Sequence, residues 1–589
     1  MNLITLLKQT TSSELDSLYQ FKIQPEEVLV NATKPEFEGD YTIVLFAFVK
    51  KLGKNPEVVG NELGVAMQKA LPQIITQFNI VKGFLNFTIS NNYWFDFIKN
   101  LSPQNLVPPT AHRKKIMVEY SSPNTNKPLH LGHLRNNFLG WSIAEILKLQ
   151  GHEVIKTCIV NDRGIHICKS MIAWQLFAEG ATPASTHKKG DHFVGDYYVK
   201  YNEAYKKEVE QLMASGMSQE IAEKEAPILK GAQQMLLLWE QGDAATLALW
   251  KKMNQWVYEG FEVTYKKIGS DFYKTYYESD TYLLGKELVQ EGLVKKVFYE
   301  KDDGSVWIDL TSDGLDEKIV RRKDGTSVYI TQDIGLAELK QKEFDTQMSI
   351  YVVGDEQNYH FKVLKLICQK LKQKSAEGIF HLSYGMVELP TGKMKSREGT
   401  VVDADDLVEE MIQISKEKTK ALGKVADFSE DALNALYNTI GLGALKFFLL
   451  RVDPKKKMIF NPEESIDFHG FTGPFIQYTY ARIKSILRKT GTAIQITQTD
   501  LLPLEKQLAI ELSIFPSVIN EAAENLDPSK IAIYAFNLAK LFNSFYAEHS
   551  ISNAETTAIK QWRIQLAILT AATLQKAMGA LGIAVPEQM

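Results

Sequence analysis

Apolar positions in the first 110 residues change between a helical and a strand-like period. MNLITLLKQTTSSELDSLYQ places them at helical spacing, which predicts an amphipathic helix. Residues 41–71 predict two helices interrupted at Pro56, because the residue before a proline disfavours helical backbone. IVKGFLNFTIS alternates as a strand does, and the proline-rich residues 101–115 predict a linker. Residues 1–110 are therefore expected to form a small α+β domain.

Beyond the linker, short apolar runs alternate with helical patterns. KIMVEYSS and HEVIKTCIVND predict strands, and each is followed by a helix, the first running to about Gln150 before Gly151. Strand–helix alternation with short links predicts an α/β domain over residues 111–402, built on a doubly wound, Rossmann-type parallel sheet. A charged helical insertion is expected near residues 181–275. Further strands are expected in SVWIDL, TSVYITQD, MSIYVVGDE and HLSYGMVEL.

The last third of the chain has helical periodicity almost throughout. A connecting region is expected over residues 403–466 and an all-α domain over residues 467–589. No run of apolar residues approaches the ~20 that a membrane span requires. Three cysteines at unrelated spacings favour a reducing compartment and are too few for a cysteine-rich zinc site. A cytoplasmic protein without membrane association or bound metal is expected. The net charge of −4 argues only weakly against a wholly basic nucleic-acid binder, and it leaves room for local basic tracks.

Candidate chemistry begins in SSPNTNKPLHLGHLRNN, the loop between the first strand and helix of the α/β domain. It offers Lys127, His130 and His133, with Gly132 between the histidines. Side chains three apart on a helix share one face, and a cationic helix N-terminus suits a polyphosphate. Gly132 leaves room for a flat ring or a phosphate to approach the backbone. From this motif alone, a pair of capping or metal-binding histidines is an equal alternative.

A second basic element, GKMKSREGTVV, follows a predicted strand and precedes a helix. Lys393, Lys395 and Arg397 lie at alternating positions in it. By itself it is typical of a solvated basic turn. Together, the two elements resemble the HIGH and KMSKS signatures of class I aminoacyl-tRNA synthetases. The blocks VEYSSPNTNKPLHLGHLRNN, TSVYITQDIGLAE, YVVGDEQNYHFK and TGPFIQYTYARIKSIL resemble those of arginyl-tRNA synthetases, from about Phe37 almost to the end of the chain.

This resemblance implies an arginine–tRNA ligase that uses L-arginine, ATP with Mg²⁺, and tRNA(Arg), as a monomer. Planar guanidinium recognition requires acceptor oxygens, carboxylates above all. The resemblance implies catalytic roles for Lys127, His130, His133 and Lys393. It implies ATP binding by His130, Gly132, His133, His360, Gly385, Met386, Lys393 and Lys395. It implies arginine binding by Glu119, Asn124, Tyr329, Asp333 and Gln357, and tRNA binding by Phe84, Asn86, Tyr478, Tyr480 and Arg482.

Several of these residues have simpler interpretations. Asp333 alone fits a helix N-cap before IGLAELK, and His360 a structural histidine. Tyr478 and Phe84 fit buried core positions equally well.

The chain also departs from the family pattern. Ser396 occupies the register of the second KMSKS lysine, and Lys127 stands where arginyl enzymes without that lysine carry a replacement cation. His166 lies where related sequences often have glutamine, and no role is assigned to it.

Two other functional classes share parts of this pattern. A small-molecule nucleotidyltransferase has the same H-x-G-H turn, but the long helical C-terminus argues against a compact enzyme of that class. A catalytically inactive RNA-binding relative is disfavoured because both histidines, Lys127 and Asp333 are present.

Overall fold

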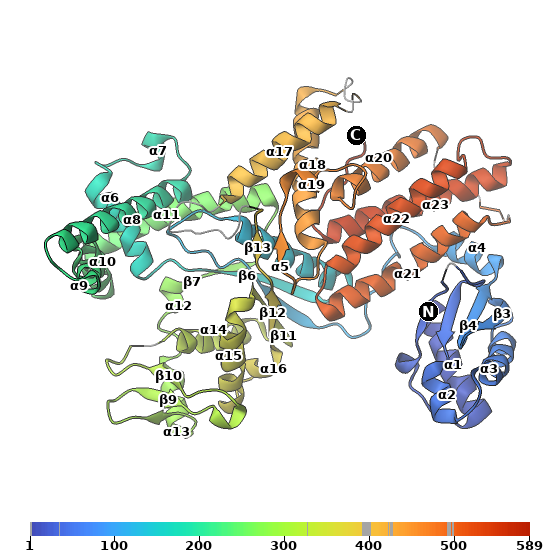
Figure 1. The fold of residues 1–589 in the computed structure, drawn as a ribbon, viewed down its shortest axis with the longest axis horizontal. Coiled ribbons are helices and arrows are strands. Elements are labelled where there is room, and N and C mark those ends of the chain that lie inside the picture. Colours follow the sequence, from blue (N-terminus) through green and yellow to red (C-terminus); the bar gives the residue numbers. More distant parts are fainter. Residues whose placement is uncertain are drawn as a thin grey trace.

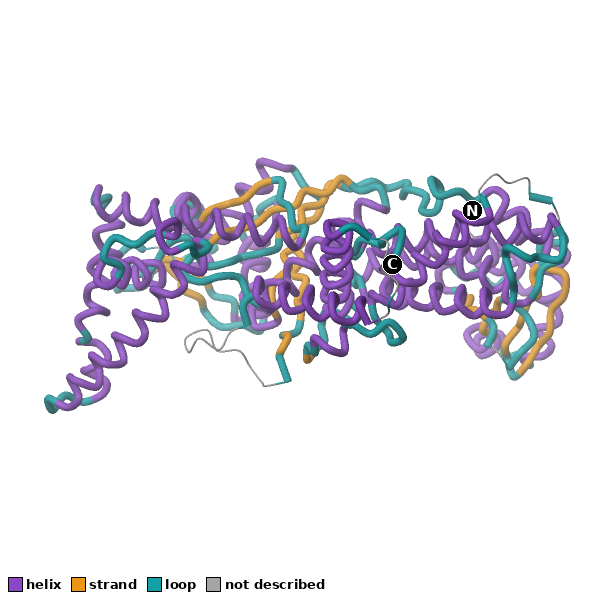
Figure 2. Tube along the Cα trace, turned by 90° about the horizontal axis from the view of Figure 1, so that it is seen from above, coloured by secondary structure: helices purple, strands orange, loops and turns teal. Residues whose placement is uncertain are grey.

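In the computed structural model the chain is elongated, with a small domain at one end and a helical arm at the other (Figures 1 and 2). The structure describes residues 3–34, 36–326, 328–390, 402–421, 423, 428–491, 496–497 and 500–589.

The N-terminal domain has a four-stranded antiparallel sheet in the order β1-β2-β4-β3, with helices against it. The expected first helix is confirmed. The expectation of two helices over residues 41–71 was partly wrong. Residues 41–44 form a strand paired with β4, which suits their β-branched side chains. A helix does restart at Pro56, capped by Asn55, whose side chain accepts from the Glu57 amide at 2.8 Å. The elements are α1 (Leu3–Tyr19), η1 (Pro25–Glu27), β1 (Val30–Ala32), β2 (Tyr41–Val44), α2 (Phe46–Leu52), α3 (Pro56–Ala70), β3 (Ile75–Val81), β4 (Phe84–Ile89) and α4 (Asn91–Asn100).

The central domain contains a five-stranded sheet in the order β12-β11-β5-β6-β7, and each neighbouring pair is parallel. The predicted doubly wound α/β fold is therefore confirmed. Its strands are β5 (Lys115–Glu119), β6 (Glu153–Val160), β7 (Lys274–Tyr277), β11 (Met348–Gly354) and β12 (Ile379–Tyr384). Helices of the domain are α5 (Leu131–Leu149), α6 (Ile165–Phe177), α12 (Glu278–Thr281), α13 (Lys286–Val294), α14 (Tyr329–Phe344), η3 (Asp355–Gln357), α15 (Asn358–Lys370) and α16 (Ser375–Gly378).

Two insertions between strands of this sheet form separate substructures. The helical insertion between β6 and β7 forms the arm, which projects from the domain in Figure 2. The predicted strand SVWIDL belongs to a separate antiparallel sheet, β10-β9-β8. These elements are α7 (Pro183–Thr186), α8 (Gly190–Ala214), α9 (Gln219–Glu225), α10 (Pro227–Glu240), α11 (Ala244–Ile268), β8 (Tyr299–Glu300), β9 (Val306–Ile308), η2 (Thr311–Asp313) and β10 (Lys318–Arg321).

The strand expected in TSVYITQD was wrong, because α14 begins within it at Tyr329. Ile330 and Ile334 are buried four residues apart, which suits one helical face but no strand. The β-branched residues misled the prediction, since tertiary packing overrides local propensity.

The C-terminal third is almost entirely helical, as predicted. Helix α18 is long and apolar enough to span a membrane by length and composition, which the sequence reading missed. Two-thirds of that stretch (67%) is buried against other parts of the protein, among them α5, α17 and α20, as in the core helix of a packed domain. The elements are β13 (Val387–Glu388), α17 (Ala404–Ala421), α18 (Glu430–Leu450), β14 (Met458–Ile459), α19 (Pro462–Ser465), α20 (Gly473–Thr490), α21 (Pro503–Asn525), α22 (Ser529–Glu548) and α23 (Thr557–Ala580).

The N-terminal domain packs on this helical bundle through α4, which contacts α21 and α23 (Figure 1). Phe95 stacks on the buried ring of Trp562 with 5.5 Å between ring centroids. Lys506 forms an ion pair with Asp40 at 2.7 Å.

Candidate active site

A cavity of about 590 Å³ opens where strands β5, β6 and β11 end. In open parallel sheets, ligands bind outside the carboxyl ends of the strands. Six of the expected site residues, from three separate segments of the chain, come together at this cavity. They are Glu119, Asn124, Tyr329, Asp333, Gln357 and His360.

Asp333 lies one turn inside α14, whose N-cap residue is Val328. The N-cap interpretation of Asp333 was therefore wrong. Tyr329 precedes Asp333 by four residues, so both side chains share one face of the helix. The Asp333 carboxylate (Oδ2) lies 2.6 Å from Nε2 of His360 on α15. His360, expected from the resemblance at the ATP site, thus contacts a residue expected to bind arginine.

Glu119 ends strand β5 at the floor of the cavity and is almost buried. Its carboxylate forms an ion pair with Lys340, which is 2% exposed, and accepts a hydrogen bond from the Thr157 hydroxyl at 3.2 Å. Burying a carboxylate is costly unless a charge compensates it. Lys340 supplies that charge, so Glu119 is already neutralised before any ligand arrives.

Glu278 also lines the cavity, and the sequence analysis missed it. Burial raises the pKa of its carboxyl to about 7, while Arg163 opposes the shift. Glu278 directly follows β7, the position where parallel-sheet enzymes place ligand-binding side chains. It was overlooked because residues 274–275 were assigned to the helical insertion, so no strand end was expected there.

Asp162 and His166 join the cavity to the arm. The Asp162 carboxylate accepts from the Ser279 amide at 2.8 Å and from the Tyr258 hydroxyl at 2.7 Å. Nδ1 of His166, a cavity residue, lies 3.1 Å from the Tyr198 hydroxyl on α8. Asp162 is thus a structural link between β6, α11 and α12, and His166 connects the arm to the cavity wall.

The two motif histidines cap helix α5. Nδ1 of His130 accepts from the Gly132 amide, and Nδ1 of His133 accepts from the His130 amide, both at 3.1 Å. Burial lowers the pKa of His130 to about 3, helped by Lys127, and lowers that of His133 well below its usual value. Both rings are therefore neutral near pH 7. With Nδ1 acting as acceptor, each ring carries its proton on Nε2 and can donate from there.

Gly132 lies against the ring of His130, and its role toward a ligand stays a prediction. A Cβ atom there would lie 3.0 Å from the His130 ring, so glycine makes room for the capping histidine. Lys127 is half-buried in the same loop, and burial lowers its pKa from the usual value.

Gly385 and Met386 follow strand β12 and are held by backbone contacts. The Gly385 amide donates to the Pro454 carbonyl at 2.9 Å, and a Cβ on Gly385 would lie 2.6 Å from the backbone of Lys456. The buried guanidinium of Arg135 on α5 donates to the carbonyls of Met386 (3.2 Å), Pro454 (3.2 Å) and Lys456 (2.8 Å). Gly385 therefore fits a close backbone approach, while Met386 keeps an exposed side chain.

Lys393 and Lys395 lie outside the described residues, as does Ser396. The replacement of the second KMSKS lysine by Lys127 stays a prediction.

The tRNA candidates of the N-terminal domain differ in accessibility. Phe84 is half-buried beside the exposed ring of Phe46, with 5.7 Å between ring centroids. Asn86 is fully buried, accepts from the Thr42 hydroxyl at 2.5 Å and donates to Asn79 at 2.8 Å. Asn86 is therefore a buried polar link between strands and cannot contact RNA directly, whereas RNA contact through Phe84 stays a prediction.

The C-terminal tRNA candidates, all on α20, also differ in accessibility. Arg482 lies 4.9 Å from the Tyr478 ring and donates to Asn543 at 2.6 Å. Tyr480 points to the opposite side of the helix and is 2% exposed, so its ring cannot stack on a base. The expectation of a contact through Tyr480 is wrong, because residues two apart on a helix face different sides.

Three family descriptions match the chain in the order of its domains. They are "Arginyl tRNA synthetase N terminal domain" over residues 5–89, "tRNA synthetases class I (R), catalytic domain" over residues 98–461, and "DALR anticodon binding domain" over residues 476–589.

Relatives of known function are similar over the whole chain. The arginine–tRNA ligases of Flavobacterium psychrophilum and Amoebophilus asiaticus are 53% and 50% identical, each with 100% of both chains covered. The solved Thermus thermophilus arginyl-tRNA synthetase superposes with a TM-score of 0.83 at 24% identity, covering 100% of both chains. Taken with the geometry of the cavity and the two motifs, these matches show that the chain belongs to the arginyl-tRNA synthetase family.

Proposed function

We propose how the residues of this arginine–tRNA ligase divide the work of its two-step reaction. A carboxylate oxygen of arginine attacks the α-phosphorus of ATP, supplied as its Mg²⁺ complex. The bond to the pyrophosphate leaving group breaks, which gives arginyl-adenylate. A ribose hydroxyl at the 3′ end of tRNA(Arg) then attacks the activated carbonyl and AMP departs. Positioning and charge neutralisation drive such in-line displacement, so no protein nucleophile is required.

The arginine side chain would enter the cavity at the carboxyl ends of the strands. Asp333 and Glu278 would accept from the guanidinium, because Glu119 is already paired with Lys340. The Tyr329 ring, on the same face as Asp333, would border the guanidinium. Asn124 and Gln357 would hold the α-ammonium group. One observation carries this proposal: carboxylates from separate segments converge on one cavity at the edge where such sheets bind ligands.

ATP would lie over the start of α5. Neutral His130 and His133 would donate from Nε2 to phosphate oxygens, as their hydrogen bonds through Nδ1 allow. Lys127 would neutralise charge that builds on the leaving pyrophosphate. The strand end at Gly385 and Met386 would border adenine, and Lys393 and Lys395 would act on the phosphates from the second motif.

tRNA(Arg) would contact both ends of the protein. Phe84 with its neighbour Phe46 would meet the body of the tRNA, and Tyr478 with Arg482 would meet unstacked anticodon-loop bases. We further propose that arginine activation requires bound tRNA, and that the enzyme works as a cytoplasmic monomer.

Pyrophosphate exchange tests this function directly. The purified protein is assayed with each of the twenty amino acids, with and without total tRNA. Of the twenty amino acids, we expect only arginine to support exchange, and only when tRNA is present. Exchange with another amino acid would refute the substrate assignment, and exchange without tRNA would refute the proposed dependence on tRNA.

A further inference from the structure

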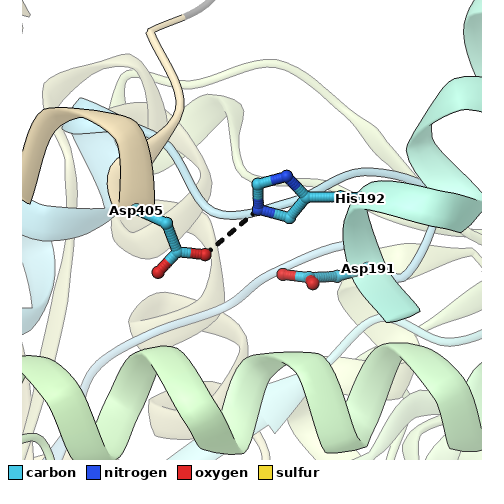
Figure 3. A group of neighbouring side chains, drawn as sticks. All are labelled: Asp191, His192 and Asp405. Carbon is cyan, nitrogen blue, oxygen red and sulfur yellow. Dashed lines mark hydrogen bonds and ion pairs between the residues drawn. The ribbon is translucent and has the colours of Figure 1, made fainter. Parts of the chain in front are cut away.

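An ion cluster joins the helical arm to the segment that follows the second motif (Figure 3). The Lys189 ammonium donates to the carboxylates of Asp191 (2.9 Å) and Asp405 (2.6 Å) and to the Thr264 hydroxyl (2.6 Å). Nε2 of His192 lies 3.1 Å from the same Asp405 oxygen. The cluster therefore ties α8 and α11 of the arm to the first turn of α17.

Asp191, His192 and Asp405 are close enough to share a metal ion. Two observations argue against that use. Lys189 already lies within hydrogen-bond distance of both carboxylates, so a cation is built in. The second oxygen of Asp191 has no hydrogen-bond partner among the described residues, but it faces the backbone of Gly260, where an added Cβ would lie 2.3 Å away. The oxygen that looks available does not point into the cluster.

The segment held by Asp405 pairs with the first motif. The Ala404 amide donates to the Leu129 carbonyl at 2.9 Å, and the Leu131 amide donates to the Val402 carbonyl at 3.2 Å. His130 and Asp403 form the antiparallel bridge between these two hydrogen bonds. The backbone of His130 is therefore fixed by residues directly adjacent to Asp405.

The arm also touches the motif loop directly. A Cβ added at Gly195 on α8 would lie 2.8 Å from the Pro128 ring, one residue from Lys127. Gly195, Lys127, His130 and Asp403 line one small cavity of about 180 Å³ between the arm and the loop. Helix α8 thus supports the loop from one side, while the segment at residues 402–404 pairs with its other end.

We propose that Lys189 is a positioning residue for the step in which ATP activates arginine. Its ion pair with Asp405 joins the arm to residues 402–404 and so fixes the backbone around His130. Lys189 does not touch the reacting atoms. It acts through the pairing of residues 402–404 with residues 129–131. The inference rests on the proposed ATP role of His130, and it assigns a catalytic purpose to the arm beyond its place as an insertion.

The test compares Lys189→Met with Lys188→Met. Lys188 is the adjacent lysine and forms an exposed ion pair with Asp196 at 2.6 Å, so it is a matched control. Displacing a positioned group by about 1 Å can lower a rate by up to ~10²-fold. We expect Lys189→Met to lower kcat for pyrophosphate exchange by about ten- to a hundred-fold. The KM for arginine should stay within about two-fold, and Lys188→Met should match the unmodified protein.

Lys189→Arg and Asp405→Asn separate positioning from simple stability. Lys189→Arg keeps the charge and should recover part of the lost kcat. Asp405→Asn keeps an acceptor oxygen for Lys189 and should give a milder loss than Lys189→Met. All variants are assayed below their unfolding midpoints, which are measured by circular dichroism.

Three outcomes would overturn the proposal. They are a folded Lys189→Met variant with unchanged kcat, a loss confined to the KM for arginine, or stoichiometric zinc or manganese binding that the variant abolishes. An unmodified protein without arginine-dependent exchange would instead refute the proposed function. In that case ATP affinity, measured by calorimetry, still tests Lys189: a ten-fold loss in Lys189→Met but not in Lys188→Met supports the positioning role, and equal affinities contradict it.

Discussion

Asp333 and Glu278 would carry the charge that the proposed arginine cavity offers to a cation, since the charge of Glu119 is compensated by Lys340. Free arginine brings two positive groups, a guanidinium and an ammonium. A cavity with two carboxylates besides the Glu119–Lys340 pair, and with two amides, suits that charge pattern. It disfavours amino acids with neutral side chains, because they bring no positive charge to a partly buried carboxylate.

Asp333→Asn should greatly weaken arginine use. The substitution keeps an acceptor near His360 but removes the charge that faces the guanidinium. Loss of one partner of a buried charge pair costs about 3–5 kcal/mol, or roughly 10²–10⁴ in kcat/KM for arginine. Steady-state exchange measures this, with exposed Asp280→Asn as control. A near-normal KM for arginine would remove Asp333 from the pocket.

Glu278 should make arginine binding depend on pH. Burial raises its pKa to about 7, so the carboxyl is mostly protonated at pH 6 and ionised at pH 8. Because a guanidinium binds the ionised form, the KM for arginine should fall by up to about ten-fold between these pH values. The Glu278→Gln variant should lose this pH dependence and should bind arginine weakly at both pH 6 and pH 8. The same shift means that stability falls as the pH rises from 4.5, the usual pKa of a glutamate carboxyl, through about 7, because the folded state then binds the proton more tightly than the unfolded state.

Lys127→Ala should slow adenylate formation. Pro123 and Pro128 restrict the loop around Lys127, so its charge is positioned before ATP binds. Removal of one such electrostatic contact typically costs ~3–4 kcal/mol, or roughly 10²–10³ in rate. Single-turnover aminoacylation measures the loss, and tRNA affinity should stay near normal.

The same assay tests whether Lys127 replaces the second lysine of the KMSKS motif. Ser396→Lys in the Lys127→Ala background should restore part of the rate, and Lys395→Ala should cost much less than Lys127→Ala. A silent Lys127→Ala with a crippling Lys395→Ala would contradict the replacement.

At the scale of elements, helix α5 links the motif to the rest of the protein. Its N-terminus carries His130 and His133, and its next turn carries Arg135, whose guanidinium binds three backbone carbonyls of the segments after β12 and before β14. The planar guanidinium holds five donors in a fixed fork, which suits three carbonyl acceptors at once. Arg135 therefore fixes the strand end at Gly385 relative to α5.

Arg135→Met should destabilise this junction. The carbonyls of Pro454 and Met386 keep the Gly385 and Met458 amides as donors, so it is the Lys456 carbonyl that loses its donor. A buried carbonyl left without a donor costs about 1–3 kcal/mol, and we expect a loss of that order. Thermal unfolding followed by circular dichroism should show a lower midpoint. Arg113→Met is the control, because Arg113 binds only the Gly151 carbonyl from an exposed position. Equal midpoints for the two variants would show that the Lys456 carbonyl finds another partner.

At the scale of the whole molecule, the N-terminal domain is anchored to the C-terminal bundle through Phe95, Trp562 and the ion pair of Lys506 with Asp40. Removing the domain would expose the Trp562 surface, so a deletion would test stability together with tRNA binding. A point substitution on its outer surface separates the two.

Phe84→Ala should raise the KM for tRNA and leave kcat at saturating tRNA unchanged, which is the mark of lost uniform binding. Stacking of one base on an aromatic ring is worth ~1–3 kcal/mol, so we expect roughly a five- to hundred-fold rise. Val65→Ala, an exposed apolar residue on α3, is the control. Equal KM values for the two variants would place the tRNA contact elsewhere.

The sequence by itself determined the features that depend on neighbouring residues. The helix break at Pro56, the parallel α/β alternation and the position of His130 and His133 at the start of a helix follow from local steric rules, strand–helix order and short motifs. The resemblance of those motifs also identified Asp333 and its companions as candidates for one pocket, although they lie far apart along the chain.

Only the tertiary structure decided which side chains are compensated, buried or brought together. Glu119 is neutralised by Lys340, which lies 221 residues away, and no local pattern records that pairing. The segment at Tyr329 is helical although its residues favour strands, and Tyr480 is buried although Tyr478 and Arg482 on the same helix are half-exposed. Each result depends on the surfaces of distant segments. The free energy gained by burying apolar side chains exceeds local secondary-structure propensity, and a buried charge is compensated only when folding brings an opposite charge beside it.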